Sequence, residues 1–136
     1  MKYLEVRNSA PVSKFIAFFE RHPILLTMGI LLICWSPYII LYLPGSIPYD
    51  GAFQLDMYLG KVPFTAHHPP LSTWLKGIFF QFGQWLGSES IGVFFYTFGQ
   101  TLLLAFTISL SIKTLIDWRL SRYVAAAAIL YFACFP

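Results

Sequence analysis

The chain has 136 residues, of which 57% are hydrophobic, 19% are aromatic and only 11% are charged. A soluble domain carries about 25% charged residues, so this composition excludes an ordinary soluble protein and indicates an integral membrane protein. The formal net charge is only +3, and the basic residues gather at 2–21 and 113–122, which is typical of membrane flanks and not of a nucleic-acid-binding surface.

Residues 1–22 form a polar segment on the cytoplasmic side. Within it, residues 13–20 place apolar side chains at helical spacing, which predicts either a short helix in the lipid headgroup region or a helical start to the first span. Residues 23–43 carry no charge and have the length of about 20 residues that a transmembrane helix needs. Pro37 is expected to kink this helix near its outer end.

Residues 44–68 form a long loop after the first span. Within this loop, residues 51–60 mix apolar and polar side chains at helical spacing, which predicts a short helix along the membrane surface. Asp50 directly precedes this segment and is a candidate N-cap, because its carboxylate can accept a hydrogen bond from a free backbone N–H of the first turn.

Residues 69–86 predict a short second transmembrane helix. Its polar side chains share one side, which must face other helices or water; they are Ser72, Thr73, Lys76 and Gln84. The alternative is a segment that only dips into the membrane.

Residues 91–112 predict a third span, and residues 113–122 predict a charged link. Residues 123–136 predict the start of a fourth span that covers about two-thirds of the required length.

These elements together predict an all-α, polytopic transmembrane protein of the cell membrane, with three full spans, the start of a fourth and a long external first loop. The excess of Lys and Arg before the first span places the N-terminus in the cytoplasm. One observation disagrees, because three spans put the basic residues of 113–122 outside the cell. The orientation is taken from the first span, because the difference in Lys and Arg between its two ends is larger.

Asp50 and the two adjacent histidines are the first candidates for chemistry. Asp50 is placed to act as a general base that takes a proton from an acceptor hydroxyl, although spacing alone favours the helix cap and the two roles can coexist. His67 and His68 precede two prolines that suit the first turn of a helix, where free N–H groups attract an anion. They are interpreted either as donors to a phosphate or as interfacial side chains that pack on the loop.

Two lysines are further candidates for binding an anionic group. Lys61 shares the side of Asp50 if the loop helix continues through Gly60, and is otherwise a solvated side chain. Lys76 lies about two turns into the second predicted span, where a buried lysine is costly and indicates a function; the alternative is a side chain that extends to the nearby helix end. Cys34 and Cys134 lie in apolar runs and are interpreted as small buried hydrophobic side chains. No set of residues has metal-ligand spacing, and no cofactor is expected.

The motifs PG-x-x-x-x-D, F-x-x-HHPP-L-x-x-W-L-x-G and G-x-x-S-x-G follow the first span in this order. This arrangement resembles the N-terminal part of the GT-C-type membrane glycosyltransferases, among them protein O-mannosyltransferases and lipid A aminoarabinose transferases. It is most similar to a bacterial family of multi-spanning membrane proteins with an HHP motif. The resemblance covers roughly residues 24–136. The Asp and HPP motifs are moderately specific, and the apolar helices are not specific.

The resemblance implies that Asp50 is the catalytic acid of the first external loop and that His67, His68, Pro69 and Pro70 lie near a polyprenyl-phosphate sugar donor. Gly51 departs from the pattern, because many relatives have a second acid there. Relatives also continue beyond a fourth helix, so this chain is expected to be a truncated product or fragment that is inactive by itself. Lys61 is added as a further contact of the donor phosphate, and Lys76 as a secondary polar group of the substrate cavity.

Two non-enzymatic alternatives stand beside the glycosyltransferase module. In the first, the chain is a small membrane protein that assembles with partner helices through Gly92, Gly99 or Gln100. In the second, it is part of a transporter whose permeation path is lined by Lys76 and Gln84. Membrane lipid is a partner in every case, and nucleic acid in none.

Overall fold

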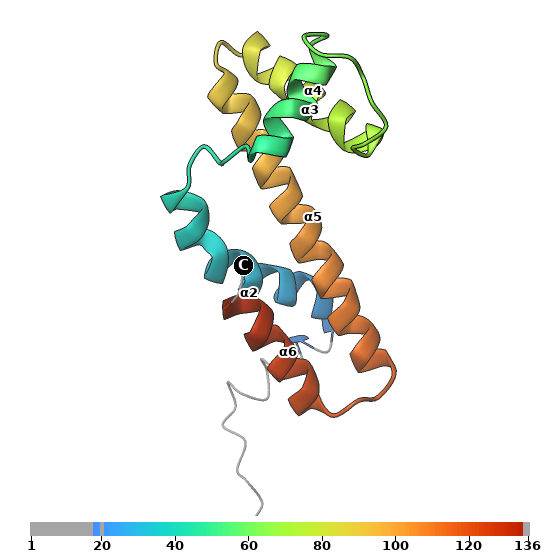
Figure 1. The fold of residues 1–136 in the computed structure, drawn as a ribbon. Coiled ribbons are helices and arrows are strands. Elements are labelled where there is room, and N and C mark those ends of the chain that lie inside the picture. Colours follow the sequence, from blue (N-terminus) through green and yellow to red (C-terminus); the bar gives the residue numbers. More distant parts are fainter. Residues whose placement is uncertain (1–17, 20, 135–136) are drawn as a thin grey trace, which may run out of the picture. The chain divides into compact units, whose positions relative to one another are not determined.

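The computed structural model describes residues 18–134 except residue 20, and the expected headgroup helix at 13–20 falls almost entirely outside this range. The described part of the chain is all-helical and contains no strand (Figure 1). Its helices are α2 (Pro23–Leu41), α3 (Tyr49–Tyr58), α4 (Pro70–Trp85), α5 (Glu89–Asp117) and α6 (Arg122–Cys134). The expectation of an all-α fold is therefore confirmed.

Among the helices of this described part, α2 and α5 are long and apolar enough to cross a membrane. They coincide with the first and third predicted spans, and Pro37 lies inside α2. α4 has 16 residues and α6 has 13, which is fewer than the roughly 20 that a transmembrane helix needs. The structure thus provides two helices of spanning length where the sequence predicts three.

The end of α5 lies further along the chain than the sequence pattern predicts. The expected charged link at 113–122 is wrong in its first half, because α5 continues to Asp117. Lys113 and Asp117 form an ion pair at i and i+4, a spacing that stabilises a helix across its last turn. Arg119 then adopts a positive φ of 56°, which ends the helix.

The chain divides into two compact units, residues 1–34 with 105–136 and residues 35–104. α2 leads from the first unit into the second, and α5 leads back. The buried hydrophobic side chains of the first unit come from α2, α5 and α6; they are Leu31, Ala105, Ile108, Ile112, Ala125, Ile129 and Ala133. The interpretation of the two cysteines as buried is wrong, because Cys34 and Cys134 are both exposed on apolar helices.

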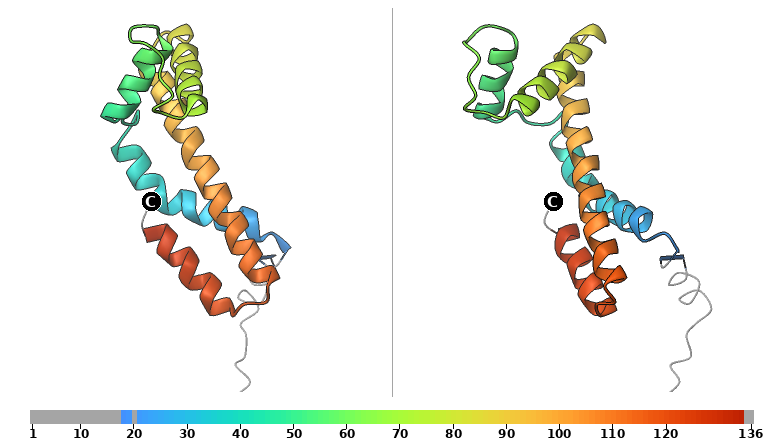
Figure 2. Two further views of the ribbon diagram at one scale, coloured as in Figure 1. Left: turned by 45° about the vertical axis from the view of Figure 1, so that its right-hand side comes forward. Right: turned by 90° about the vertical axis from the view of Figure 1, so that its right-hand side faces the viewer.

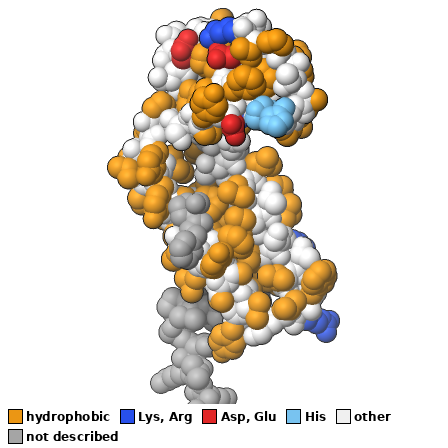
Figure 3. All heavy atoms as spheres, viewed as in Figure 1, with side chains coloured by type: hydrophobic (Ala, Val, Ile, Leu, Met, Phe, Trp, Pro, Cys, Tyr) orange, Lys and Arg blue, Asp and Glu red, His pale blue; other side chains and the backbone are white. Residues whose placement is uncertain are grey.

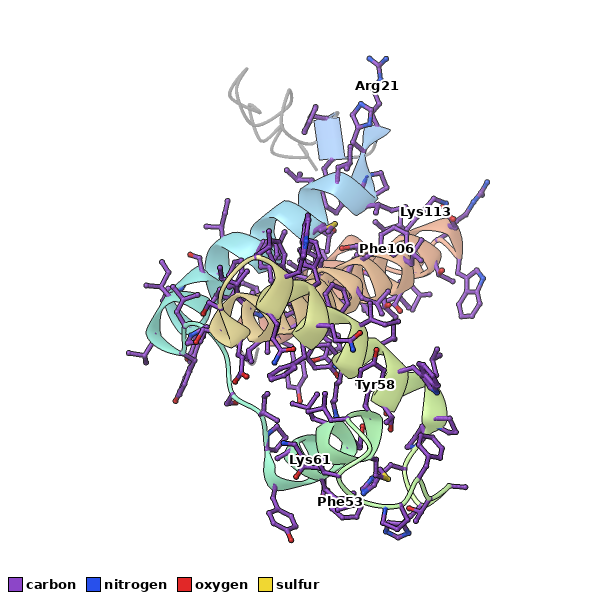
Figure 4. All side chains as sticks on the ribbon, turned by 90° about the horizontal axis from the view of Figure 1, so that it is seen from above. Arg21, Phe53, Tyr58, Lys61, Phe106 and Lys113 are labelled. Carbon is purple, nitrogen blue, oxygen red and sulfur yellow. The ribbon has the colours of Figure 1, made fainter. Side chains whose placement is uncertain are left out.

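In the second unit, α3 lies beside α4 in both views of Figure 2 and packs against it. Gly77 permits this contact, because a β-carbon at this position would overlap the Tyr58 ring. The Tyr58 hydroxyl donates to Gln81 Oε1 at 2.8 Å, and the Tyr58 ring meets the Trp74 ring edge-on. Tyr58 thus lies between α3 and α4 (Figure 4) and fixes their separation.

α4 and α5 approach even more closely at a pair of glycines. A β-carbon on Gly83 would overlap the backbone of Gly92, and a β-carbon on Gly92 would lie 2.5 Å from the carbonyl oxygen of Phe79. Both contacts are with backbone atoms, which cannot rotate away. Gly92 therefore permits a close helix approach, and the neighbouring helix is α4 of the same chain.

The loop between α2 and α3 is attached to the side of α5. Thr97 Oγ1 donates to the carbonyl oxygen of Pro44 at 3.2 Å. Gly45 has a φ of 124° and lies so close to the Thr97 side chain that no β-carbon fits. This attachment fixes where α3 begins, and therefore where Asp50 lies.

Candidate functional site

A polar cluster forms where α3 meets α4, and Gln54 is at its centre. Gln54 and Met57 are three residues apart, so they share one face of α3, and both are buried. Gln54 Oε1 accepts hydrogen bonds from Ser72 Oγ at 3.0 Å and from Lys76 Nζ at 2.9 Å. One amide oxygen thereby holds two polar side chains of α4 on the inner side of that helix.

Lys76 is half-buried and projects into a pocket of about 140 Å³. Its ammonium nitrogen lies 5.9 Å from the centroid of the Tyr96 ring, which is within the range of a cation–π interaction. The walls come from the loop before α3, from α3, α4 and α5, and include Ser46, Gly51, Leu55, Phe80, Tyr96 and Gln100. The sequence-predicted Lys76 is therefore directed at α3 and α5, and does not extend to the helix end.

Asp50 lies in the first turn of α3 and is exposed. The prediction that Asp50 caps the helix is wrong, because α3 begins at Tyr49, one residue before Asp50. The N-cap is Pro48, and no side chain makes a capping hydrogen bond there. The fixed φ of proline suits a helix start, and a carboxylate in the first turn interacts favourably with the helix dipole. The Asp50 carboxylate is also close enough to the Lys76 ammonium to interact with it electrostatically.

The two histidines lie just before α4 and contact each other and α3. Their rings meet edge-on with centroids 5.1 Å apart, and the His68 ring packs on Phe53 at 6.0 Å. Phe53 is three residues from Asp50 and shares its side of α3, so His68 lies on the Asp50 side. On the face shown in Figure 3, an acidic side chain and histidine side chains lie next to each other. The ring contacts agree with histidines that pack on the loop.

Lys61 is separated from this cluster. α3 ends at Tyr58, so the helix does not continue through Gly60 and the condition for Lys61 to share the side of Asp50 is not met. Lys61 is exposed and forms an ion pair with Asp56 at 3.0 Å, and it follows the last residue of α3, whereas Asp50 lies in the first turn. The structure therefore places Asp50 in electrostatic range of Lys76 and His68 against Phe53 of α3, and leaves Lys61 out.

Sequence reasoning did not select Gln54 or Tyr96 as site residues. Gln54 lies 18 and 22 residues before its partners Ser72 and Lys76, and no local pattern reveals such a pairing. One signal was available, because Gln54 is four residues after Asp50 and shares its helix side. Tyr96 belongs to an apolar helix, where an aromatic residue carries no distinctive signal.

The cluster combines a half-buried ammonium with an exposed carboxylate, and this pair can hold an anionic group and accept a proton from a nearby hydroxyl. Within the described residues, no group of three or more His, Cys, Asp or Glu side chains is arranged to hold a metal ion. No protein-family model, curated protein or solved structure matches the chain. The function must therefore be argued from the chemistry of the cluster and from the motifs around it.

Proposed function

We propose that this chain is the N-terminal module of a membrane glycosyltransferase that binds the phosphate of a polyprenyl-phosphate sugar in the Lys76 pocket. The module lies in the cell membrane with its N-terminus in the cytoplasm, and transfer takes place on the external face. The observation that supports the proposal best is the Lys76 ammonium inside a pocket with largely apolar walls.

The chemistry of an ammonium favours an anionic ligand at this position. An ammonium has three N–H donors, and Gln54 Oε1 accepts one of them. Phosphate oxygens are strong acceptors for such a donor, and a charge-assisted hydrogen bond is about twice as strong as a neutral one. Partial burial of an ammonium is costly unless a partner stabilises its charge. The donor phosphate supplies that partner.

Asp50 is the proposed base for the acceptor hydroxyl. Its carboxylate is exposed at the start of α3, in electrostatic range of Lys76. A donor phosphate on Lys76 therefore places the sugar beside a group that is able to take the proton of an incoming hydroxyl. His68 lies on the same side of α3 and contacts the donor phosphate in this proposal, whereas Lys61 has no part in it.

The contacts of Gly92 and Gln100 weigh against the assembly alternative in the form that the sequence suggests. The backbone of α4 already packs against Gly92, which leaves no room for a partner helix there. Gln100 Nε2 donates a hydrogen bond to the Tyr96 hydroxyl at 2.8 Å. The transporter alternative requires Lys76 and Gln84 along one path, yet Gln84 pairs with Glu89 beside the start of α5. Neither alternative accounts for the position of Asp50 beside Lys76.

Lys76→Met is expected to weaken binding of a polyprenyl-phosphate hexose by about 10- to 100-fold, because one charge-assisted hydrogen bond is lost and the side-chain volume is kept. Binding is measured by titration of the purified protein in detergent, with the polyprenol that lacks phosphate as reference ligand. Lys61→Met is the matched control and is expected to bind as the wild type does, because Lys61 pairs with Asp56 away from the pocket. Equal affinity of wild type and Lys76→Met would exclude the pocket as the phosphate site.

A further inference from the structure

α4 presents a continuous apolar stripe on the side away from Lys76. Six exposed side chains fall within an arc of about 100°, the width of one apolar helix face; they are Leu71, Trp74, Leu75, Ile78, Phe82 and Trp85. The buried residues Thr73, Gly77 and Gly83 lie outside this arc and face α3 and α5. α4 is therefore an amphipathic helix with one side in the protein and one side largely exposed, where the Trp74 ring also meets Tyr58 and the Phe82 ring meets Phe95.

The contact between α3 and α4 is incompatible with α4 crossing a membrane. Tyr58 packs on Gly77, which is the eighth of the 16 residues of α4. If α4 crossed the bilayer, Gly77 would lie near its centre and would take Tyr58 with it. The hydrocarbon would then contain the non-helical residues after Tyr58 and the nearby Asp56–Lys61 ion pair. Each unsatisfied backbone group or charge costs on the order of several kcal/mol there.

The two tryptophans of the stripe give an independent argument from length. α4 is about 24 Å long at 1.5 Å per residue, and the hydrocarbon core is about 30 Å thick. Tryptophan prefers the membrane–water interface, but Trp74 and Trp85 are only about 16 Å apart along the helix. This separation is too short for the two tryptophans to lie at opposite interfaces. Trp74 and Trp85 reach the same interface only if α4 lies along the membrane surface.

We propose that the stripe of α4 rests on the lipid of the non-cytoplasmic leaflet, so that the described part of the chain crosses the membrane twice, through α2 and α5. Lipid is the occupant because α4 is joined to α5 by a short turn at 86–88, and α5 is long and apolar enough to cross. The surface helix is therefore held at the level where that crossing begins. This inference does not depend on glycosyl transfer.

Two crossings also remove the conflict between the two basic clusters. α2 starts after Arg21, and α5 ends near Lys113 and Arg119. With α4 on the surface, the start of α2 and the end of α5 lie on the same side of the membrane. Both basic clusters are then cytoplasmic, as the distribution of Lys and Arg in membrane proteins requires.

The position of α4 is tested by single cysteines in a Cys34→Ala, Cys134→Ala background. Ala66→Cys and Ser90→Cys mark exposed positions before and after α4, and Ser121→Cys marks the exposed turn after α5. An impermeant thiol reagent applied to intact cells is expected to label the first two positions, and to label Ser121→Cys only after permeabilisation. If α4 crossed the membrane, Ala66→Cys would still be labelled, but Ser90→Cys would be protected and Ser121→Cys would be labelled, and this pattern would overturn the proposal.

Lipid contact is tested by a nitroxide label at Ile78, in protein reconstituted into vesicles of phosphatidylethanolamine and phosphatidylglycerol. Oxygen dissolves in lipid and shortens the spin relaxation of a nitroxide by collision, whereas a water-soluble nickel chelate does so from the aqueous side, and the ratio of the two effects reports depth. The expected result is a lipid-accessible label at shallow depth, with the label at Leu104 of α5 deeper as the reference. A partner helix or a second copy of the chain on the stripe would shield the label at position 78 from both oxygen and a water-soluble nickel chelate. That result would contradict lipid as the occupant.

Discussion

Replacing Asp50 with asparagine is expected to lower sugar transfer by on the order of 10²-fold or more, because asparagine cannot take the proton of the acceptor hydroxyl. Binding of the polyprenyl-phosphate hexose is expected to stay largely unchanged, since Lys76 and not Asp50 holds the phosphate in the proposed site. Sugar transfer is measured with a donor that carries a radiolabelled sugar. The assay uses native membranes, so that any further segments and subunits of the protein are present.

The structure removes the main objection to this experiment. A carboxylate that caps α3 would make the substitution ambiguous, but the Asp50 side chain makes no capping hydrogen bond. Loss of its charge removes a helix-dipole interaction of about 0.3–1 kcal/mol and the electrostatic interaction with Lys76. Asparagine is nearly isosteric with aspartate and keeps one hydrogen-bond acceptor oxygen. A large loss of activity therefore reports on the proton and not on the fold.

Asp56→Asn is the matched control, because it changes the same group on the same short helix. Asp56 pairs with exposed Lys61, and an exposed ion pair contributes about 0–1 kcal/mol, so transfer is expected to stay within about twofold of wild type. His68→Ala is expected to weaken donor binding instead of the chemical step. Turnover of Asp50→Asn at the wild-type rate would remove Asp50 from the mechanism and leave the glycosyltransferase motifs as a likeness of sequence alone.

The helices of spanning length could be predicted from the sequence, because a bilayer leaves the backbone few choices. A long uncharged segment must satisfy its own N–H and C=O groups, and a helix does this. The prediction of 23–43 therefore differs from α2 by only two residues. The end of α5 was less predictable, because the Lys113–Asp117 pair continues a helix where charge alone suggests a link.

The candidate site could be predicted only as a set of residue types. Hydrophobic periodicity correctly placed Ser72, Thr73 and Lys76 on one side of the second apolar segment, and all three face inward. It could not show that this side meets Gln54, since that contact joins separate helices. The start of α3 was misplaced by two residues, and this was enough to change Asp50 from a helix cap into an exposed first-turn carboxylate.

The same long-range packing explains why α4 was predicted as a span. Length and composition of 69–86 describe the helix alone, and an apolar stripe of about 100° is common to surface helices and bundle helices. The decisive information is the neighbour on the other side, because Tyr58 attaches a short polar helix to the middle of α4. Any substitution that separates the helices of this unit is therefore expected to have a large effect.

Gly92→Ala is expected to destabilise the protein by about 3 kcal/mol, at the upper end of the usual cost of overpacking. The added methyl group would lie 2.5 Å from the carbonyl oxygen of Phe79 and 2.9 Å from the Cα of Phe80. These atoms belong to the backbone of α4, so the helices must separate to admit it. Alanine favours a helix over glycine by about 1 kcal/mol, and the clash outweighs this gain.

Gly99→Ala on the same helix is the matched control and is expected to change stability in the opposite direction. A β-carbon there meets only Phe79 Cζ at 4.0 Å, which is an ordinary contact, so the gain in helix propensity of up to about 1 kcal/mol is kept. Both variants are unfolded with sodium dodecyl sulfate in mixed micelles and followed by tryptophan fluorescence. If Gly92→Ala were as stable as Gly99→Ala, the close backbone contact of α4 with α5 would be wrong, because no rotation of a side chain relieves it.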